Sequence, residues 1–102
     1  MEKVKILRYE NGGKYKWHTD CGAKETSLRK LTAIVQLSDE TKYEGGNLEF
    51  GITDKSGKNN YTAPRTRGSI TIFPAFLSHR VTPITKGRRY SLITWMLGDC
   101  FV

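Results

Sequence analysis

The sequence has 102 residues, 26% of them charged, and a formal net charge of +7, which together describe one small basic domain with a single core. Hydrophobic residues make up 37% of the chain, and no apolar run approaches the roughly 18 residues that a membrane-spanning helix needs. The N-terminus lacks the apolar stretch of a signal peptide, and two isolated cysteines, Cys21 and Cys100, fit a reducing compartment. We therefore expect a cytoplasmic protein with no membrane association.

Short alternating or β-branched segments, separated by Gly, Asn, Asp and Pro, predict an all-β chain of about eight strands. The expected strands cover residues 4–9, 14–18, 29–38, 47–50, 60–63, 69–73, 79–84 and 89–97. Turns are expected at 10–13, 54–57 and 86–87, and a tight glycine turn at 43–46. No segment has helical periodicity. Eight such strands favour a double-stranded β-helix, the cupin-like jelly roll, over an immunoglobulin-type sandwich.

A histidine and a carboxylate stand two residues apart in His18-Thr19-Asp20. Residues i and i+2 of a strand share a face, so both side chains can reach one point. The only other histidine, His79, follows the segment 74–78 and opens a predicted strand. Two imidazoles and one carboxylate on one face of a metal form the facial triad of non-haem Fe(II) oxygenases. Taken alone, a His-x-Asp pair is common by chance and is often a surface pair.

Arg89 lies ten positions after His79 on a strand that is otherwise apolar, and it is expected to face inward. A buried guanidinium must be paired, and a small-molecule carboxylate offers it bidentate geometry. Ser91, two residues on and on the same strand face, can donate its hydroxyl to the same carboxylate. The alternatives are that Arg89 pairs with a protein carboxylate such as Glu49, or that Arg88 is the inward residue.

The chain resembles the prolyl 4-hydroxylase-like branch of the 2-oxoglutarate/Fe(II)-dependent dioxygenase superfamily over nearly its whole length. The matching stretches, in the correct order, are RYENGGKYKWHTD (8–20), LTAIVQLS (31–38), YEGGNL (43–48), GSITIFP (68–74), SHRVTP (78–83) and GRRYSLITW (87–95). An arginine at position 89, where collagen-type enzymes have lysine, favours the bacterial and phage-type hydroxylases. The resemblance implies one catalytic core over residues 1–102, without most of the N-terminal helices that usually support this fold.

Carried over by position, the resemblance implies that His18, Asp20 and His79 bind iron and form the catalytic centre. Arg89 would bind the distal carboxylate of 2-oxoglutarate. Further residues expected around the cosubstrate are Tyr9, Ser91, Gln36 and Leu48. Trp95 is expected in the core behind the site, and residues 43–46 close to its mouth.

The implied function is hydroxylation of a peptidyl residue such as proline, coupled to oxidative decarboxylation of 2-oxoglutarate to succinate and CO₂. The implied cofactors are Fe(II), 2-oxoglutarate and O₂, with ascorbate as a candidate reductant. Two alternatives stay open: a nucleic-acid oxygenase or demethylase, which the net charge of +7 encourages, and a catalytically inactive jelly-roll binding module. A peptide or protein substrate is the expected partner, and a second copy or another protein is a candidate to cover an exposed sheet face.

Overall fold

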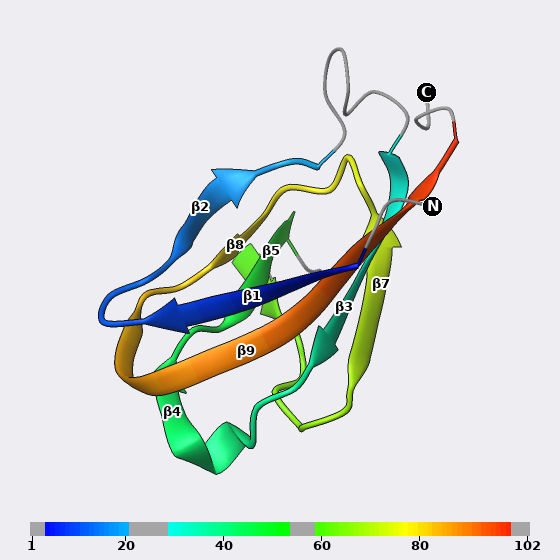
Figure 1. Cartoon of the computed structure of the whole chain (residues 1–102). Helices are drawn as coiled ribbons and strands as arrows, with labels where there is room; N and C mark the ends of the chain where they lie inside the picture. The colour runs from blue at the N-terminus through cyan, green and yellow to red at the C-terminus, as the bar shows by residue number, and fades with distance from the viewer. Residues whose placement is uncertain (1–3, 21–28, 54–58, 99–102) are drawn as a thin grey trace.

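The computed structural model describes residues 4–20, 29–53 and 59–98 (Figure 1). These residues form nine strands: β1 (Lys5–Glu10), β2 (Tyr15–His18), β3 (Arg29–Gln36), β4 (Tyr43–Gly45), β5 (Leu48–Thr53), β6 (Asn59–Thr62), β7 (Ile70–Pro74), β8 (His79–Val81) and β9 (Ile84–Leu97). The one helical turn among them is a 3₁₀ turn, η2 (Glu40–Lys42). Within these ranges the chain contains no helix long and apolar enough to span a membrane.

The strands form two antiparallel sheets. The major sheet has the order β1-β9-β3-β7, with β4 also paired to β9, and the minor sheet has the order β2-β8-β5-β6. Figure 1 shows β9 (orange) running the length of the molecule beside β1. Apart from the consecutive pair β5–β6, neighbours in each sheet are far apart in sequence, as in the crossovers of a jelly roll. The predicted double-stranded β-helix is therefore confirmed.

The core lies between the two sheets because alternate residues of each strand face inward. On β3, Thr32, Ile34 and Gln36 are buried, whereas their neighbours are only partly so. The apolar residues of the core come from both sheets, with Ile34 from the major sheet and Phe50 from the minor sheet among them. The inner face of β9 carries both polar and apolar side chains, namely Arg89, Ser91, Ile93 and Trp95. Polar groups on this face are the first sign of a site inside the fold.

The opposite face of the major sheet is also apolar. One row runs across β1, β9, β3 and β7, because the register pairs Ile6 with Leu92, Leu92 with Val35, and Val35 with Ile70. Ile6 and Ile70 are 67% and 63% exposed, and Ile72, two residues along β7, is 61% exposed. We call this surface the outer apolar face.

The two predicted glycine turns are replaced by a strand pair. Residues 86–87 do not turn but lie within β9, and residues 43–45 form β4, which pairs with them. Gly87 has φ +77°, and a Cβ there would lie 2.2 Å from the Lys42 carbonyl oxygen. Glycine is therefore needed here because another backbone passes close to it. A tight turn, as predicted from the sequence, is not the reason.

Candidate metal centre and its cavity

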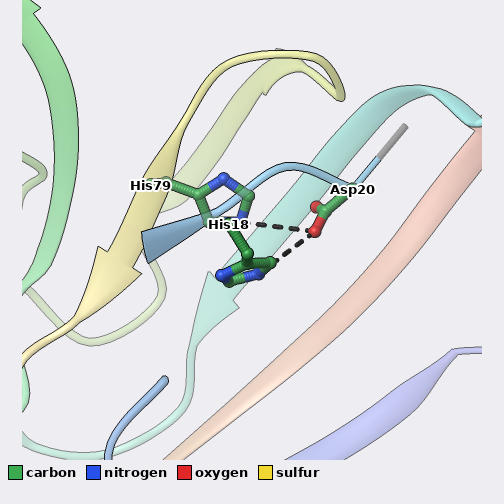
Figure 2. Close-up of side chains that lie close together, drawn as sticks. All are labelled: His18, Asp20 and His79. Atoms are coloured by element: carbon green, nitrogen blue, oxygen red, sulfur yellow. Dashed lines mark ion pairs between the residues drawn. The ribbon is translucent and has the colours of Figure 1, made fainter. Parts of the chain in front are cut away.

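Three side chains that are distant in sequence meet between the sheets. His18 ends β2, Asp20 follows two residues later, and His79 opens β8 directly opposite His18 in the β2–β8 register. Figure 2 shows both imidazoles beside the Asp20 carboxylate. Oδ1 of Asp20 lies 3.3 Å from Nε2 of His18 and 3.4 Å from Nε2 of His79. One ligand atom from each residue lies within 4.8 Å of the others, which is close enough for all three to bind one ion.

Backbone contacts set which nitrogen of each histidine is available. Nδ1 of His18 lies 2.6 Å from the Lys16 carbonyl oxygen, and Nδ1 of His79 lies 2.8 Å from the Leu77 carbonyl oxygen. A carbonyl oxygen only accepts, so each Nδ1 carries the proton and each Nε2 lone pair is left for a metal. Burial alone would lower the pKa of His18, but hydrogen bonds to Asp20 and to the Lys16 carbonyl raise the pKa above its ordinary value.

The second oxygen of Asp20 is held from the major sheet. The Thr32 hydroxyl donates to Oδ2 at 2.6 Å, and the Trp95 indole N–H donates to the same oxygen at 3.1 Å. Burial alone would raise the pKa of Asp20, but hydrogen bonds with His18, His79 and Thr32 outweigh that effect and hold the pKa well below its usual range. Asp20 is therefore an ionised and oriented carboxylate, with Oδ1 turned toward the histidines.

A cavity of about 460 Å³ opens from this cluster into the space between the sheets. All three residues of the cluster line it, and so does Arg89. Apolar side chains such as Ile34, Leu48 and Val81 form much of the remaining wall. A cavity of this size, mostly apolar with a few convergent polar groups, is typical of a small-molecule site.

Arg89 is the most deeply buried cation of the cavity. It is 1% exposed, and its Nε and Nη2 groups find no hydrogen-bond acceptor among the described residues. Both alternatives raised by the sequence fail: Glu49 pairs with Arg80 at 2.7 Å, and Arg88 is exposed and pairs with Glu10 at 2.7 Å. Burial lowers the pKa of the Arg89 guanidinium, an effect that Tyr9 and Tyr43 oppose. Two buried N–H groups without acceptors fit a bound carboxylate.

Of the other residues expected around a cosubstrate, some line the cavity and one does not. Tyr9, Leu48 and Ser91 line the cavity, and the Ser91 hydroxyl is a further buried group without a partner among the described residues. The Arg89 guanidinium lies 5.1 Å from the centre of the Tyr9 ring, and burial raises the pKa of Tyr9. Gln36 is buried and is not among the residues that line the cavity, but it pairs with Ser91 in the β3–β9 register. Its Oε1 is also a buried atom without a partner among the described residues, so its place beside a cosubstrate stays a prediction.

Several residues of the site were not expected from the sequence, among them Thr32, Lys5 and Arg29. Thr32 holds Asp20, and Lys5 and Arg29 line the cavity. A threonine in a β-branched strand carries no signal of its own, and Lys5 and Arg29 are two of 17 basic residues spread along the chain. Trp95 was expected behind the site and does lie there. Cys21 and Cys100 lie outside the described residues.

A jelly roll with two imidazoles and one carboxylate converging on an open cavity defines the class of facial-triad metal proteins. The chain belongs to the 2OG-Fe(II) oxygenase superfamily, whose family model matches residues 4–97. This finding confirms the family to which the sequence was assigned by resemblance.

The chain is similar to curated hydroxylases of this family. A PKHD-type hydroxylase from Synechococcus sp. (strain CC9605) is 32% identical over 96 residues, which cover 94% of this chain and 42% of that protein. The fold is shared with a Pseudomonas putida prolyl-4-hydroxylase (TM-score 0.79, 22% identity, 94% of this chain and 52% of that one). It is also shared with a Trichoplax adhaerens prolyl hydroxylase solved in complex with a hypoxia inducible factor peptide fragment (TM-score 0.73, 18% identity, 95% and 43%). The chain spans less than half the length of the curated relatives it matches.

Proposed function

We propose that residues 1–102 form the catalytic core of an Fe(II)- and 2-oxoglutarate-dependent hydroxylase that acts on a peptidyl residue such as proline. The observation that carries the proposal is one cavity joining a His-Asp-His cluster to a buried arginine whose N–H groups lack acceptors. Membership of the superfamily and the likeness to PKHD-type hydroxylases support it.

The donor set fits Fe(II). His18, Asp20 and His79 would hold the ion through two neutral nitrogens and one carboxylate oxygen, which leaves the remaining positions open toward the cavity. Bound iron and 2-oxoglutarate together supply O₂ activation, which couples conversion of 2-oxoglutarate to succinate and CO₂ with hydroxylation of a C–H bond. The protein contributes orientation, charge placement and exclusion of water.

Arg89 and Ser91 would bind the distal carboxylate of 2-oxoglutarate. The buried guanidinium gains the acceptor that its Nε and Nη2 groups lack, and the Ser91 hydroxyl donates a further hydrogen bond. Tyr9 packs its ring against the guanidinium and limits the access of water to the ion pair. Removal of the positive charge would therefore cost cosubstrate affinity much more than metal affinity.

The first experiment measures succinate formation from 2-oxoglutarate under air, with Fe(II) and ascorbate. The parent is expected to turn over slowly without a prime substrate, and His79→Ala is expected to lose turnover and Fe(II) binding together. If the parent neither binds Fe(II) nor forms succinate, the proposed function is wrong.

The substitution Arg89→Met tests cosubstrate binding separately from metal binding. We expect the variant to need at least about tenfold more 2-oxoglutarate for half-maximal turnover, because a charge-assisted bidentate contact is lost. Its Fe(II) affinity should change less than about threefold. Arg88→Met is the matched control, since Arg88 is exposed on the same strand and should leave both values unchanged. Equal effects of the two substitutions would remove Arg89 from the cosubstrate site.

A further inference from the structure

The cavity opens along the side of the molecule where both sheets end. β1 is an edge strand of the major sheet, and β2 is an edge strand of the minor sheet. Figure 1 shows these two strands diverging from the turn that joins them. Lys5 of β1 and Tyr15 of β2 both line the cavity and are both exposed, Tyr15 to 48%. A substrate that reaches the His-Asp-His cluster from this side therefore passes between the two edge strands.

The free edge of β1 follows from the hydrogen-bond pattern of the major sheet. Alternate residues of an antiparallel strand bond to its two opposite neighbours. The Leu37 N–H donates to the Tyr90 carbonyl, so even-numbered residues of β9 bond to β3 and odd-numbered residues bond to β1. Odd residues of β9 pair with odd residues of β1, which leaves the N–H and C=O groups of Ile6 and Arg8 on the side away from β9. Among the described residues, none bonds to these four backbone groups.

The edge of β2 is less regular. The β2–β8 register shifts between Tyr15 and His18, so that three steps along β2 match two steps along β8. Within this segment the Lys16 carbonyl already accepts a hydrogen bond from Nδ1 of His18, at 2.6 Å. A bulge and an occupied carbonyl make an edge a poor template for a further strand. β1 therefore offers the better edge at the opening of the cavity.

We propose that a peptide substrate adds to β1 as an extended antiparallel strand, with the hydroxylated residue opposite Leu7. The proposal rests on the proposed function and names how its peptide is held. An extended main chain matches the alternating N–H and C=O groups of Ile6 and Arg8. A phosphate backbone cannot do so, because it has acceptors but no donors for the two carbonyls. The antiparallel orientation is the one that β1 already has with β9.

The position opposite Leu7 suits a proline. Leu7 lines the same cavity as the His-Asp-His cluster. Residues directly opposite one another in an antiparallel pair have their side chains on one face, so the peptide residue opposite Leu7 also points into the cavity. The backbone groups of that residue point away from β1, and a proline there loses no hydrogen bond to the protein. The residues before and after it face Arg8 and Ile6 and form the hydrogen bonds.

The test uses a mixture of short acetylated peptides with a central proline, two alanines after it and random residues elsewhere. Main-chain pairing is common to all members, so the mixture acts as one probe. Hydrogen exchange of the protein is measured by mass spectrometry without O₂, with Fe(II) and 2-oxoglutarate present, so that no turnover occurs. We expect the mixture to slow exchange at the Ile6 and Arg8 amides. Exchange should not change at the amides of Ile70 and Ile72, which point away from β3 on the other edge strand, β7.

Replacing one alanine of the peptides by lactic acid turns an amide into an ester and removes a single N–H. The first residue after the proline directs its N–H to β1, and the second directs its N–H away. We expect lactic acid at the first position to raise the peptide concentration for half-maximal protection about fivefold, because one hydrogen bond is lost. Lactic acid at the second position should leave that concentration unchanged. Equal effects at the two positions, or no protection at Ile6 and Arg8, would overturn the proposal.

Arg8→Pro changes the edge from the protein side. Proline is tolerated in an edge strand where its missing N–H would point to solvent, and here it removes one donor of the proposed pair. We expect protection of the Ile6 amide to need about tenfold more peptide. Arg8→Ala, which keeps the N–H, and Ile72→Pro, the corresponding change on β7, should both bind like the parent. Unweakened binding in Arg8→Pro would contradict the proposal, and if this variant does not fold, the ester peptides decide the question with the parent alone.

The remaining outcomes separate this inference from the proposed function. Exchange at Ile6 and Arg8 that slows with protein concentration, and not with peptide, would assign the edge to a second copy and overturn the inference. If the parent forms succinate in a His79-dependent manner but the peptides do not protect this edge, the hydroxylase assignment stands and the strand-pairing inference is wrong. If the parent forms no succinate and binds no Fe(II), the hydroxylase assignment itself is wrong.

Discussion

Asp20 engages its two carboxylate oxygens separately. Oδ1 meets the two histidines of the minor sheet, and Oδ2 accepts from Thr32 and Trp95 of the major sheet. A carboxylate held in this way has one orientation and a depressed pKa, so it is ready for a metal without rearrangement. The arrangement makes Thr32 and Trp95 candidate positioning residues, which touch Asp20 and would not bind a metal themselves.

Thr32→Val tests this positioning role. Valine keeps the shape of threonine but removes the hydroxyl, so one hydrogen bond to a charged group, about 1.5–3 kcal/mol, is lost. We expect metal affinity to fall about 10- to 100-fold, as measured by anaerobic Fe(II) titration. Thr85→Val, on the exposed part of β9, is the control and should leave the affinity unchanged. An unchanged affinity in Thr32→Val would mean that Asp20 does not need the Thr32 hydroxyl for its orientation.

The pH dependence of metal binding should follow His18. A histidine binds metal only when neutral, and a pKa raised above 6.5 keeps His18 protonated to a higher pH. Asp20, with its lowered pKa, stays ionised over the same range. Apparent metal affinity should therefore begin to fall at a pH above 6.5 as the solution is acidified, as measured by Co(II) absorbance titrations at a series of pH values. A fall that begins only well below pH 6.5 would show that protonation of His18 does not control metal binding.

Sequence reasoning reached some residues of the site and not others, for identifiable reasons. His18 and Asp20 were predictable because alternation places residues two apart on one strand face. Arg89 was predictable because a charge in an apolar strand needs a partner. Thr32 was not, since it lies 12 residues from Asp20 in the other sheet and its type is ordinary in a strand. The roles of these residues in binding iron and cosubstrate remain predictions.

At the scale of elements, β9 organises the molecule. It pairs with β1, β3 and β4, and its inner face carries both Arg89 and Trp95. The strand continues through residues 86–87 because Gly87 admits the backbone of β4 beside it. The close approach at Gly87 is thus a condition for the long strand.

Gly87→Ala should be much more destabilising than Gly68→Ala. Both glycines have positive φ, +77° and +84°, so both substitutions carry the backbone strain, about 1 kcal/mol. A Cβ at Gly68 meets nothing within 4 Å, whereas one at Gly87 would lie 2.2 Å from a carbonyl oxygen of Lys42. We expect a loss of about 1 kcal/mol at Gly68 and of about 3 kcal/mol or more at Gly87, measured by urea unfolding. Equal losses would show that β4 can move away at little cost.

The expected turns at 43–46 and 86–87 were wrong for one reason. The local sequence shows that a glycine permits an unusual backbone conformation. It does not show whether a turn or the close approach of a neighbouring strand requires that glycine. β4 has three residues, too few for a periodic pattern to be recognised. The register shift between Arg29 and Leu31 is hidden in the same way, because it exists only in the pairing of β3 with β9. Longer segments such as β3 and β7 were predictable from their β-branched composition.

At the scale of the whole molecule, the outer apolar face should behave as accessible hydrophobic surface. Ile70 and Ile72 stand side by side on β7 at more than 60% exposure, next to the row through Val35 and Leu92. Replacing both isoleucines by lysine should clearly lower the fluorescence of a bound apolar dye and raise solubility, with little change in unfolding free energy. Tyr61→Lys, an exposed change on the minor sheet, is the control. Dye binding that is unchanged by the isoleucine substitutions would locate the accessible apolar surface elsewhere.

The family and the fold class were predictable from sequence because many weak signals occur in one order along the chain. Period-two segments specify strands, and the polar residues within them separate a jelly roll with a site from a plain sandwich. Which residues form the outer apolar face depends on the register of the strands, and the sequence alone does not give that register. A second copy or another protein covering that face stays a prediction.

Arg89 and Trp95 lie on the same strand, so the distance between these two ends of the cavity can change only in steps of whole residues. Both ends of the cavity are fixed to one continuous β9, so the spacing between them changes only when residues are inserted or deleted. Only a change of two residues, about 7 Å, keeps every side chain on its own face. A single methylene in a ligand is far shorter than that step. The spacing between the two ends of the cavity is therefore set by the number of residues between Arg89 and Trp95 on β9.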